Sequence, residues 1–442
     1  MLFGLTLPLA SAPGFTNVRD HGAIPDGAAN NTAAFERAVA ACAALGGGTI
    51  CVPAGRYLTG SIRLESNQTL WLEAGAELLY SGDPADSPIV PSRWEGTRVH
   101  GRAPLVYAYE RENVSIVGRG RLNGQGSNWW WRNGVHDPLR AQSALAAIHA
   151  WKSLYAQIEA GEPVGPGAFL AASDFLRPSL VQFNGCRNVL VEGVTLTESP
   201  MWMLHPVFCE NVVVRGVTLI STGPNGDGIS VDSSRDVRIS DCFFDTGDDC
   251  VVIKSGRDAD GRRTARPTEN VAIANCVMHR GHGAVVVGSE TAGGIRNVVA
   301  SNIVSRGTDR GIRIKSMRGR GGVVENLRFE NFVIEDALKE ALEINALYQP
   351  TAEEPVSERT PAFRNISLSN LTIVNAERVA RIEGLPEQPI TGLRLANITA
   401  TGRTGVHCEH VADLDIRDVH VDPASGPAFD YRHIGVLRPA AT

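Results

Sequence analysis

Short runs in which apolar residues occupy every second position dominate the chain, and these runs recur. "CRNVLVEGVTL" begins at Cys186, and "CENVVVRGVTL" begins at Cys209, 23 residues later. Looser copies extend from near residue 111 to near residue 420, each with an Asn or Asp at the same place. Alternation predicts β-strands, and a repeat of roughly 20 to 40 residues predicts a solenoid. The marker positions are Asn113, Asn188, Asn211, Asp236, Asn270, Asn297, Asn326, Asn365 and Asp413.

Each repeat lacks a helical pattern, so one repeat fits one coil of a parallel β-helix. The recurring Asn is expected to be a turn residue that stacks on its counterparts in the neighbouring coils. The length of 442 residues would by itself suggest about three domains. The repeats predict instead an all-β fold class, with one solenoid domain over residues 15–442.

Two segments interrupt the strand pattern with helical periodicity. The first covers residues 32–45, ends at Gly46 to Gly48, and is expected to cap the N-terminal end of the solenoid. Its apolar face is predicted from the spacing of Phe35, Ala38, Val39, Cys42 and Leu45.

The second helical segment lies in a loop insertion at about 127–180, where the marker spacing widens. Asp137 is the expected N-cap, Pro138 the first helical residue and Gly161 the stop. Before it stands "NWWW", Asn128 to Trp131, whose tryptophans suit either sugar stacking or anchoring of the insertion. The predicted apolar face of this helix is Leu145, Ile148, Trp151, Tyr155 and Ile158.

Composition and charge exclude several classes of function. The net charge is −6 without any basic block, which argues against nucleic acid as a partner. There is no run of 18 or more apolar residues, so no membrane span is expected. The eight cysteines form no CxxC pair, which disfavours a zinc site, and we expect them to be buried small hydrophobes.

Residues 1–14, "MLFGLTLPLASAPG", resemble the remnant of a signal peptide. They hold a short apolar stretch and an Ala-Ser-Ala similar to a cleavage site, but no Lys or Arg precedes Arg19. The expected location of the protein is therefore secreted or periplasmic.

Within each coil a second strand also repeats, and its copies align without gaps. Alternation places Ile229, Val251, Val285, Ile312 and Leu342 in one inward column, with a second inward column two residues later. The outward columns hold Asp232 and Lys254, for which we expect a stacked ion pair. The aligned strands are 228–232, 250–254, 284–288, 311–315 and 341–345.

Polar residues gather at the corner that precedes these strands. Asp227, Asp249 and Gly283 share one column, and Gly226, Asp248 and His282 share the adjacent one. Since stacked coils lie about 4.8 Å apart, the three aspartates and the histidine are expected to converge. Any one of them alone is as readily a turn residue. Together they crowd like charges, which stable folds tolerate mainly where chemistry uses them.

Clustered carboxylates suit glycoside hydrolysis with inversion. One carboxylic acid protonates the leaving oxygen, and a second carboxylate activates water on the other face of the sugar. Arg313 and Lys315 are expected on the same face as the aspartates, where they would suit a carboxylated sugar. A groove along a solenoid suits a polymer.

Four motifs, in order and spacing, resemble those of the polygalacturonases, glycoside hydrolase family 28, and the resemblance runs from about residue 15 to about 420. It implies a right-handed parallel β-helix and cleavage of α-1,4-galacturonosidic bonds in pectin, an acidic polysaccharide. It implies no cofactor and no metal. The motifs are "NGD" at Asn225–Asp227, "GDD" at Gly247–Asp249, "GHG" at Gly281–Gly283 and "RIK" at Arg313–Lys315.

The resemblance also implies roles for individual residues. Asp248 would be the general acid, Asp227 and Asp249 would hold the attacking water, and His282 would tune the acid. The residues expected to contact substrate are Arg313, Lys315, Tyr348 and Asn225.

Two departures and several alternatives remain. Gly226 stands where the family commonly has Thr, which puts a local substrate contact in doubt. The insertion at 127–180 is expected to close one end of the groove and make the enzyme exo-acting. The alternatives are a rhamnogalacturonan or xylogalacturonan hydrolase, a Ca²⁺-dependent pectate lyase, and a carbohydrate-binding solenoid without activity.

Overall fold

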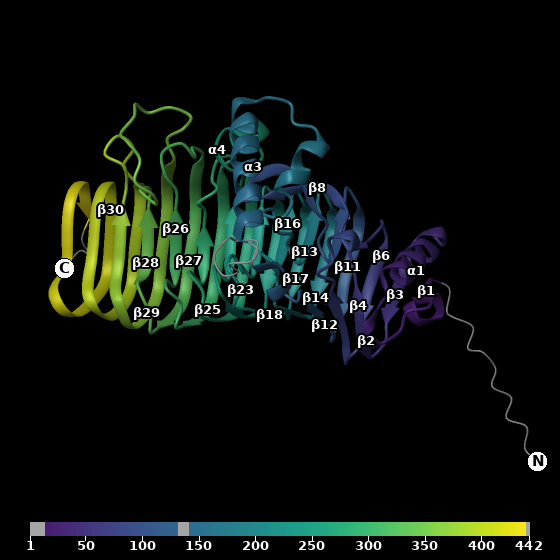
Figure 1. The fold of residues 1–442 in the computed structure, drawn as a ribbon. Helices are drawn as coiled ribbons and strands as arrows, with labels where there is room; N and C mark the ends of the chain where they lie inside the picture. The colour runs from purple at the N-terminus through teal and green to yellow at the C-terminus, as the bar shows by residue number, and fades with distance from the viewer. Residues whose placement is uncertain (1–13, 131–140, 439–442) are drawn as a thin grey trace, which may run out of the picture.

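The strands that the repeats predict pair in parallel with the equivalent strands of the next coil, and the chain winds into a long parallel β-helix (Figure 1). The computed structural model describes residues 14–130 and 141–438. Successive coils build three columns of strands. The fold class predicted from the sequence is confirmed.

The column that carries the polar corner consists of short strands. Their register pairs Ile229 with Val251, Val251 with Val285, Val285 with Ile312 and Ile312 with Leu342, as the gapless alignment predicts. All five side chains are buried in the continuous core. The strands are β5 (Ile62–Arg63), β10 (Val106–Tyr109), β13 (Val181–Asn184), β16 (Leu204–Val207), β19 (Ile229–Asp232), β22 (Val251–Lys254), β24 (Val285–Val287), β26 (Ile312–Lys315) and β28 (Glu340–Asn345).

The other two columns close each coil and merge into long bent strands toward the C-terminus. One column contains β1 (Phe15–Asn17), β3 (Gly48–Val52), β6 (Gln68–Leu72), β11 (Glu112–Gly118), β14 (Arg187–Glu192), β17 (Glu210–Arg215) and β20 (Arg235–Ser240). The other contains β2 (Asp26–Asn30), β4 (Gly55–Thr59), β7 (Ala76–Tyr80), β12 (Arg121–Asn123), β15 (Thr195–Thr197), β18 (Thr218–Ser221) and β21 (Phe243–Thr246). The merged strands are β23 (Thr268–His279), β25 (Ile295–Arg306), β27 (Val323–Glu335), β29 (Ala362–Glu383) and β30 (Thr391–Arg438).

The marker asparagines form a ladder, which confirms their predicted role. Asn297 donates from its side-chain amide to Asn270 at 3.0 Å, and Asn326 donates to Asn297 at 3.1 Å. These residues have φ near +57°, a left-handed turn conformation that Asn tolerates. The series ends before Asp413, whose carboxylate accepts from the backbone N–H of Gly392. A second ladder through Asp241, Asn275, Asn302 and Asn331 was not predicted.

Helix α1 (Thr32–Ala44) covers the N-terminal end of the coil, as predicted (Figure 1). Four of its predicted apolar residues, from Phe35 to Cys42, are buried. Leu45 was assigned wrongly to this face, because it lies beyond the last helical turn and is 65% exposed. The chain turns away at Gly48, where φ is +137° and a Cβ would lie 2.2 Å from the Gly14 carbonyl oxygen.

Helix α3 (Ala141–Ala160) lies in the predicted insertion and stands on the outside of the coil (Figure 1). It ends at Gly161, as predicted, whereas Asp137 and Pro138 lie outside the described residues. Leu145 was assigned wrongly to the apolar face, because the buried stripe runs through Ala144, Ala147, Trp151, Leu154 and Ile158.

The tryptophans before this helix anchor the chain. Trp129 is fully buried and stacks on Tyr80 at 5.0 Å, and Trp130 donates its ring N–H to the Ser199 carbonyl. Trp131 lies outside the described residues. For Trp129 and Trp130 the anchoring interpretation is therefore the one that fits.

A second hydrophobic cluster joins α3 to a hairpin of β8 (Ile89–Trp94) and β9 (Thr97–Arg102). Trp94 packs on Trp151, and Trp202 from the coil belongs to the same cluster. Helix α4 (Asp258–Thr264) is tied to α3 through Glu159, which accepts from the N–H of Ala259. The remaining helical turns are η1 (Val18–His21), η2 (Pro84–Asp86), α2 (Ser127–Trp130) and η4 (Pro166–Ala172).

All eight cysteines are free and buried, as predicted. Among the helices of the described residues, none has the length and apolar character needed to cross a membrane.

Candidate active site

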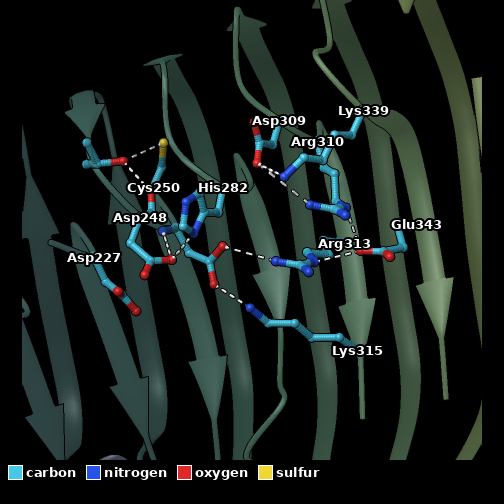
Figure 2. A network of polar contacts seen from close by, with 12 residues as sticks. Asp227, Asp248, Cys250, His282, Asp309, Arg310, Arg313, Lys315, Lys339 and Glu343 are labelled. Carbon is cyan, nitrogen blue, oxygen red and sulfur yellow. Dashed lines mark hydrogen bonds and ion pairs between the residues drawn. The ribbon is translucent and has the colours of Figure 1, made fainter. Parts of the chain in front are cut away.

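The corner residues converge as the sequence alignment predicts (Figure 2). Asp227 precedes β19, Asp248 and Asp249 precede β22, and His282 precedes β24. Because these strands pair in register, the four side chains lie on neighbouring coils around one point. Together with Arg313 and Lys315 of β26, they line a cavity of about 290 Å³.

The strand face that carries the site is more buried than the alternation of the sequence predicts. The columns that alternation marked as outward are buried, including Ser230 and Val252, and Lys254 is only 5% exposed. The hairpin β8–β9 and the loops that follow β22, β24 and β26 fold over this face. The site therefore lies on the floor of a walled groove, where charges are poorly hydrated.

Asp249 is held by two cations. Lys315 donates to its Oδ2 at 2.8 Å, and an Arg313 guanidinium nitrogen lies 3.8 Å from its Oδ1 (Figure 2). The Oδ1 atom is buried and has no hydrogen-bond partner among the described residues. Asp249 lines the cavity, and this buried oxygen is an acceptor without a donor among the described residues.

Asp248 is the most accessible of the three carboxylates, with 18% of its side chain exposed. Its Oδ1 lies 2.9 Å from His282 Nδ1 and accepts the N–H of Asp249 at 2.9 Å. Burial opposes its ionisation, but the hydrogen bond and charge of His282 prevail, so the pKa of Asp248 lies below its ordinary value. The same hydrogen bond raises the pKa of His282.

Asp227 is in the opposite electrostatic situation. Burial and the neighbouring charge of Asp248 raise its pKa well above the ordinary value. Its Oδ2 accepts from Ser230 at 3.3 Å and lies 3.8 Å from Lys254 Nζ. Two carboxylates of the cluster thus differ in proton affinity, with Asp227 holding a proton more readily than Asp248.

Lys254 does not form the predicted ion pair with Asp232. Lys254 lies 3.0 Å from Glu290 and 4.8 Å from the centre of the Trp202 ring, so it belongs to the site. Asp232 pairs instead with Arg93 of the hairpin at 3.3 Å, with both side chains fully buried. Strand register brings Asp232 and Lys254 side by side, but Asp232 pairs with Arg93 on β8 and Lys254 with Glu290 on the loop after β24.

The groove beyond Asp249 carries a cationic patch with an aromatic cover. Arg313 donates to Glu343 at 2.7 Å, and its guanidinium carbon lies 5.5 Å from the centre of the Tyr348 ring. Lys315 Nζ lies 5.4 Å from the same ring. Tyr348 therefore lies against both cations of the cavity.

Asn225 also lines the cavity, with φ at +54°. Its side-chain oxygen accepts from Arg177 at 2.7 Å. Arg177 also donates to the carbonyls of Pro200 and Pro224. This arginine fixes the loop that presents Asp227, a role that no local pattern in the sequence indicates.

Sequence reasoning missed the other end of the cavity. Glu95, at the tip of the β8–β9 hairpin, lies 2.8 Å from Arg257, which follows β22. Gly96 is packed closely against this segment, and a Cβ at this position would lie 2.9 Å from the Arg257 backbone nitrogen, which is too close. The further lining residues that were missed are Trp202, Lys254, Ser289, Glu290, Arg320 and Gln349. Lys254 is the last residue of an aligned strand, but it was assigned to an ion pair with Asp232, and Glu290 lies two residues beyond the aligned strand 284–288.

Residues 172–419 match the sequence model of the glycosyl hydrolases family 28, and residues 15–75 match one described as rhamnogalacturonase A/epimerase, pectate lyase-like. A probable polygalacturonase of Vitis vinifera is 32% identical over 393 residues, which cover 86% of this chain and 73% of that protein. An exo-poly-alpha-D-galacturonosidase of Dickeya chrysanthemi is 30% identical over 393 residues, covering 84% of this chain and 64% of that protein.

Among solved structures, a hyperthermoactive exopolygalacturonase from Thermotoga maritima superposes with a TM-score of 0.86. It is 37% identical, and the match covers 94% of this chain and 93% of the Thermotoga chain. The family match at 172–419 includes every corner residue from Asn225 to Tyr348.

Proposed function

The chain belongs to family 28 of the glycosyl hydrolases, the family of the polygalacturonases, and from this premise we propose that it hydrolyses polygalacturonate from the chain end with inversion. The observation that carries the proposal is the convergence of Asp227, Asp248 and Asp249 beside Arg313 and Lys315 on the floor of one groove. The carboxylates supply acid and base, and the cations suit a galacturonate carboxylate.

Asp248 is the proposed general acid, because it is the carboxylate most accessible from the groove. Its low pKa means that it must receive the proton that it donates. His282 is the adjacent source, with Nδ1 at 2.9 Å and a raised pKa. The proton passes from His282 to Asp248 and from Asp248 to the leaving glycosidic oxygen as the C1–O bond breaks.

Asp249 and Asp227 are proposed to hold the attacking water. The charge of Asp249 is compensated by Lys315, while its Oδ1 has no hydrogen-bond partner among the described groups. Water bound there adds to C1, and Asp249 takes its proton. Asp227, which holds a proton more readily, orients the same water as a donor.

Arg313, Lys315 and Tyr348 are proposed to bind the galacturonate on the leaving-group side. Arg313 and Lys315 are the cations nearest to Asp249, and Tyr348 covers both. The pairing of Arg313 with Glu343 holds the guanidinium in place before substrate arrives. A bidentate contact with a carboxylate explains the preference for an acidic polysaccharide.

Exo action is proposed from the wall at the Glu95 end of the cavity. The hairpin and α3 pack through the second hydrophobic cluster, α4 is joined to α3 by the Glu159–Ala259 hydrogen bond, and Glu95 at the hairpin tip pairs with Arg257. A polymer that enters the groove would stop there with its terminal sugar. The exo-acting relatives of Dickeya and Thermotoga support this proposal.

The lyase alternative fits the charges less well. Lys315 lies 2.8 Å from Asp249 and Lys254 lies 3.8 Å from Asp227, so two ammonium groups occupy the positions from which Ca²⁺ would attract these carboxylates. A secreted or periplasmic location is proposed on the ground that a pectic polymer is met outside the cytoplasm.

The test is product analysis from polygalacturonate in water enriched in ¹⁸O, with EDTA present. We expect saturated monogalacturonate with one heavy oxygen from the earliest time points, and proton NMR should show the β anomer first. Unsaturated products would identify a lyase, and oligomers as first products would contradict exo action. Hydrolysis of xylogalacturonan or rhamnogalacturonan alone would change the assigned backbone.

A further inference from the structure

Three histidines lie close together on β30, at the end of the coil opposite α1 (Figure 1). They are His407, His410 and His433, and they surround the carboxylate of Glu409. None of them lines the active-site cavity. The cluster therefore has no part in the proposed reaction.

Both oxygens of Glu409 face imidazole nitrogens. Its Oε1 lies 3.2 Å from His433 Nδ1 and 3.7 Å from His410 Nε2. Its Oε2 lies 3.6 Å from His407 Nε2. One ligand atom each from Glu409, His410 and His433 lies within 4.8 Å of the other two.

The backbone of successive coils places the two outer imidazoles. His410 and His433 lie 23 residues apart, on adjacent coils, and both have left-handed φ values of +53° and +48°. The repeated turn aims both side chains the same way, and their rings are parallel at 4.7 Å with an angle of 4°. Because a metal ion binds in the plane of an imidazole ring, the exposed ring of His433 has to turn out of this stack before both rings can bind one ion.

The carboxylate of Glu409 has no Lys or Arg within ion-pair distance in the described part of the chain. His407 is oriented from behind, because its Nδ1 lies 2.9 Å from Asp430. His407 Nε2 lies 3.6 Å from the second oxygen of Glu409, so His407 positions this carboxylate and is not itself one of the three groups that lie within 4.8 Å of one another. Glu409, partly buried among imidazoles, is a negative charge that a cation would compensate.

We propose that Glu409, His410 and His433 bind a divalent transition-metal ion of the zinc class. Imidazole and carboxylate are ligands that Zn²⁺ accepts at about 2.0–2.2 Å. Tetrahedral ligands at such distances lie about 3.4 Å apart, close to the separations of Glu409 from the two histidines. The ion joins two successive coils, since Glu409 and His410 belong to one coil and His433 to the next.

This end of the coil has a structural use for such a link. Tyr431, Val436 and Leu437 are exposed there, and no helix of the described residues covers them as α1 covers the other end. A metal bridge would hold the coil of His433 against its neighbour. The proposed site is therefore structural, and activity is expected to be independent of it.

The test is titration calorimetry of Zn²⁺ into the full-length, metal-stripped protein without a histidine tag, at pH 7.5. We expect one tight site per chain, weakened at least about 10-fold in Glu409→Gln and in His433→Asn. The matched control is His420→Asn, because His420 lies on the same strand, is exposed, and among the described residues its ion pair is with Asp418, outside the proposed site. Its affinity for Zn²⁺ should equal that of the unmodified chain.

Hydrogen exchange on the unmodified protein provides a readout that does not depend on a variant folding. Zn²⁺ should slow exchange of backbone amides in residues 406–436 and leave those around the active site unchanged. Absence of Zn²⁺ binding, equal binding by Glu409→Gln and His433→Asn, or no local protection would each overturn the proposal. Activity on polygalacturonate, measured in parallel with EDTA, reports separately on the proposed function.

Discussion

Lys315 donates a hydrogen bond to Asp249 across 2.8 Å, although 66 positions separate the two residues in sequence. Both side chains are nearly inaccessible, at 7% and 2% exposure. A buried ammonium and a buried carboxylate are each costly alone, so the pair links β26 to the corner before β22 across the intervening strand β24.

Replacing Lys315 by Met should therefore destabilise the fold as well as reduce activity. The substitution leaves Asp249 buried with only the more distant Arg313, and we expect a loss of about 3 kcal/mol in the free energy of unfolding. Urea denaturation measures it. Lys339→Met is the matched control, because Lys339 pairs with Asp309 at an exposed position and should cost less than about 1 kcal/mol. Equal losses in both variants would contradict the interpretation.

Asp248→Asn should remove the proton donor and keep the shape of the site. We expect kcat on polygalacturonate to fall about 10³-fold with little change in KM, since a general acid acts mainly in the transition state. The control is Asp245→Asn, three residues earlier, where the carboxylate pairs with Arg280 on the surface. That variant should retain activity, and initial rates of reducing-end release test both.

The strand columns and the polar corner were predictable because both depend on local repetition. Once Ile229, Val251 and Val285 are aligned, the positions of Asp227, Asp249 and His282 follow from strand register. The marker asparagines likewise followed from their spacing. In a solenoid each repeat contacts the repeats next to it, so aligning the repeats in sequence indicates which residues are neighbours in space.

The walls of the groove were not predictable in the same way. Glu95, Arg93 and Arg177 reach the site from segments without repeat partners, and their positions depend on packing between distant segments. The wrong pairing of Asp232 with Lys254 has this cause, because Arg93 arrives from the hairpin. Leu145 was misplaced because helical spacing indicates which residues share a face of α3 but not which face packs against the rest of the protein.

His282 should give the enzyme a pH dependence on the alkaline side. Its pKa is raised by the hydrogen bond to Asp248, above the ordinary 6.5. Because the pKa of His282 is higher in the folded state than in the unfolded state, its protonation stabilises the fold. This contribution is complete at pH values below the unfolded-state pKa and is lost as the pH rises through the folded-state pKa. In wild type, kcat should fall over the same range, because His282 loses the proton that it supplies.

His282→Gln keeps a hydrogen-bond donor but cannot titrate. Its kcat should be lower, and the alkaline inflection should be absent from its pH–rate profile. The stability difference between wild type and variant should be largest below pH 6.5 and shrink above it. An unchanged inflection in the variant would assign it to another group. The measurements are kcat and urea midpoints from pH 4.5 to pH 9.

Glu95→Ala should weaken exo action. The substitution removes the ion pair with Arg257 at the closed end of the cavity. We expect kcat/KM on digalacturonate to fall about 10-fold, as for loss of one charge-assisted contact. Viscosity should also fall faster per reducing end released, which reports internal cleavage. The control is Glu192→Ala, a surface glutamate paired with Arg215 on the outside of the coil. An unchanged product pattern in Glu95→Ala would contradict the role of the hairpin.

The asparagine ladder allows backbone and side-chain effects to be separated at one position. Asn297 donates to Asn270, accepts from Asn326, and has φ at +57°. Asn297→Ala loses two hydrogen bonds and the amide side chain that lets Asn tolerate the left-handed region, so we expect a cost of about 2 kcal/mol in the free energy of unfolding. Asn297→Gly loses the same bonds without that backbone penalty and should cost about 1 kcal/mol. Urea unfolding, followed by circular dichroism and fluorescence, measures both. If Ala and Gly cost the same, the left-handed turn contributes nothing at this position and the ladder is held by its amides alone.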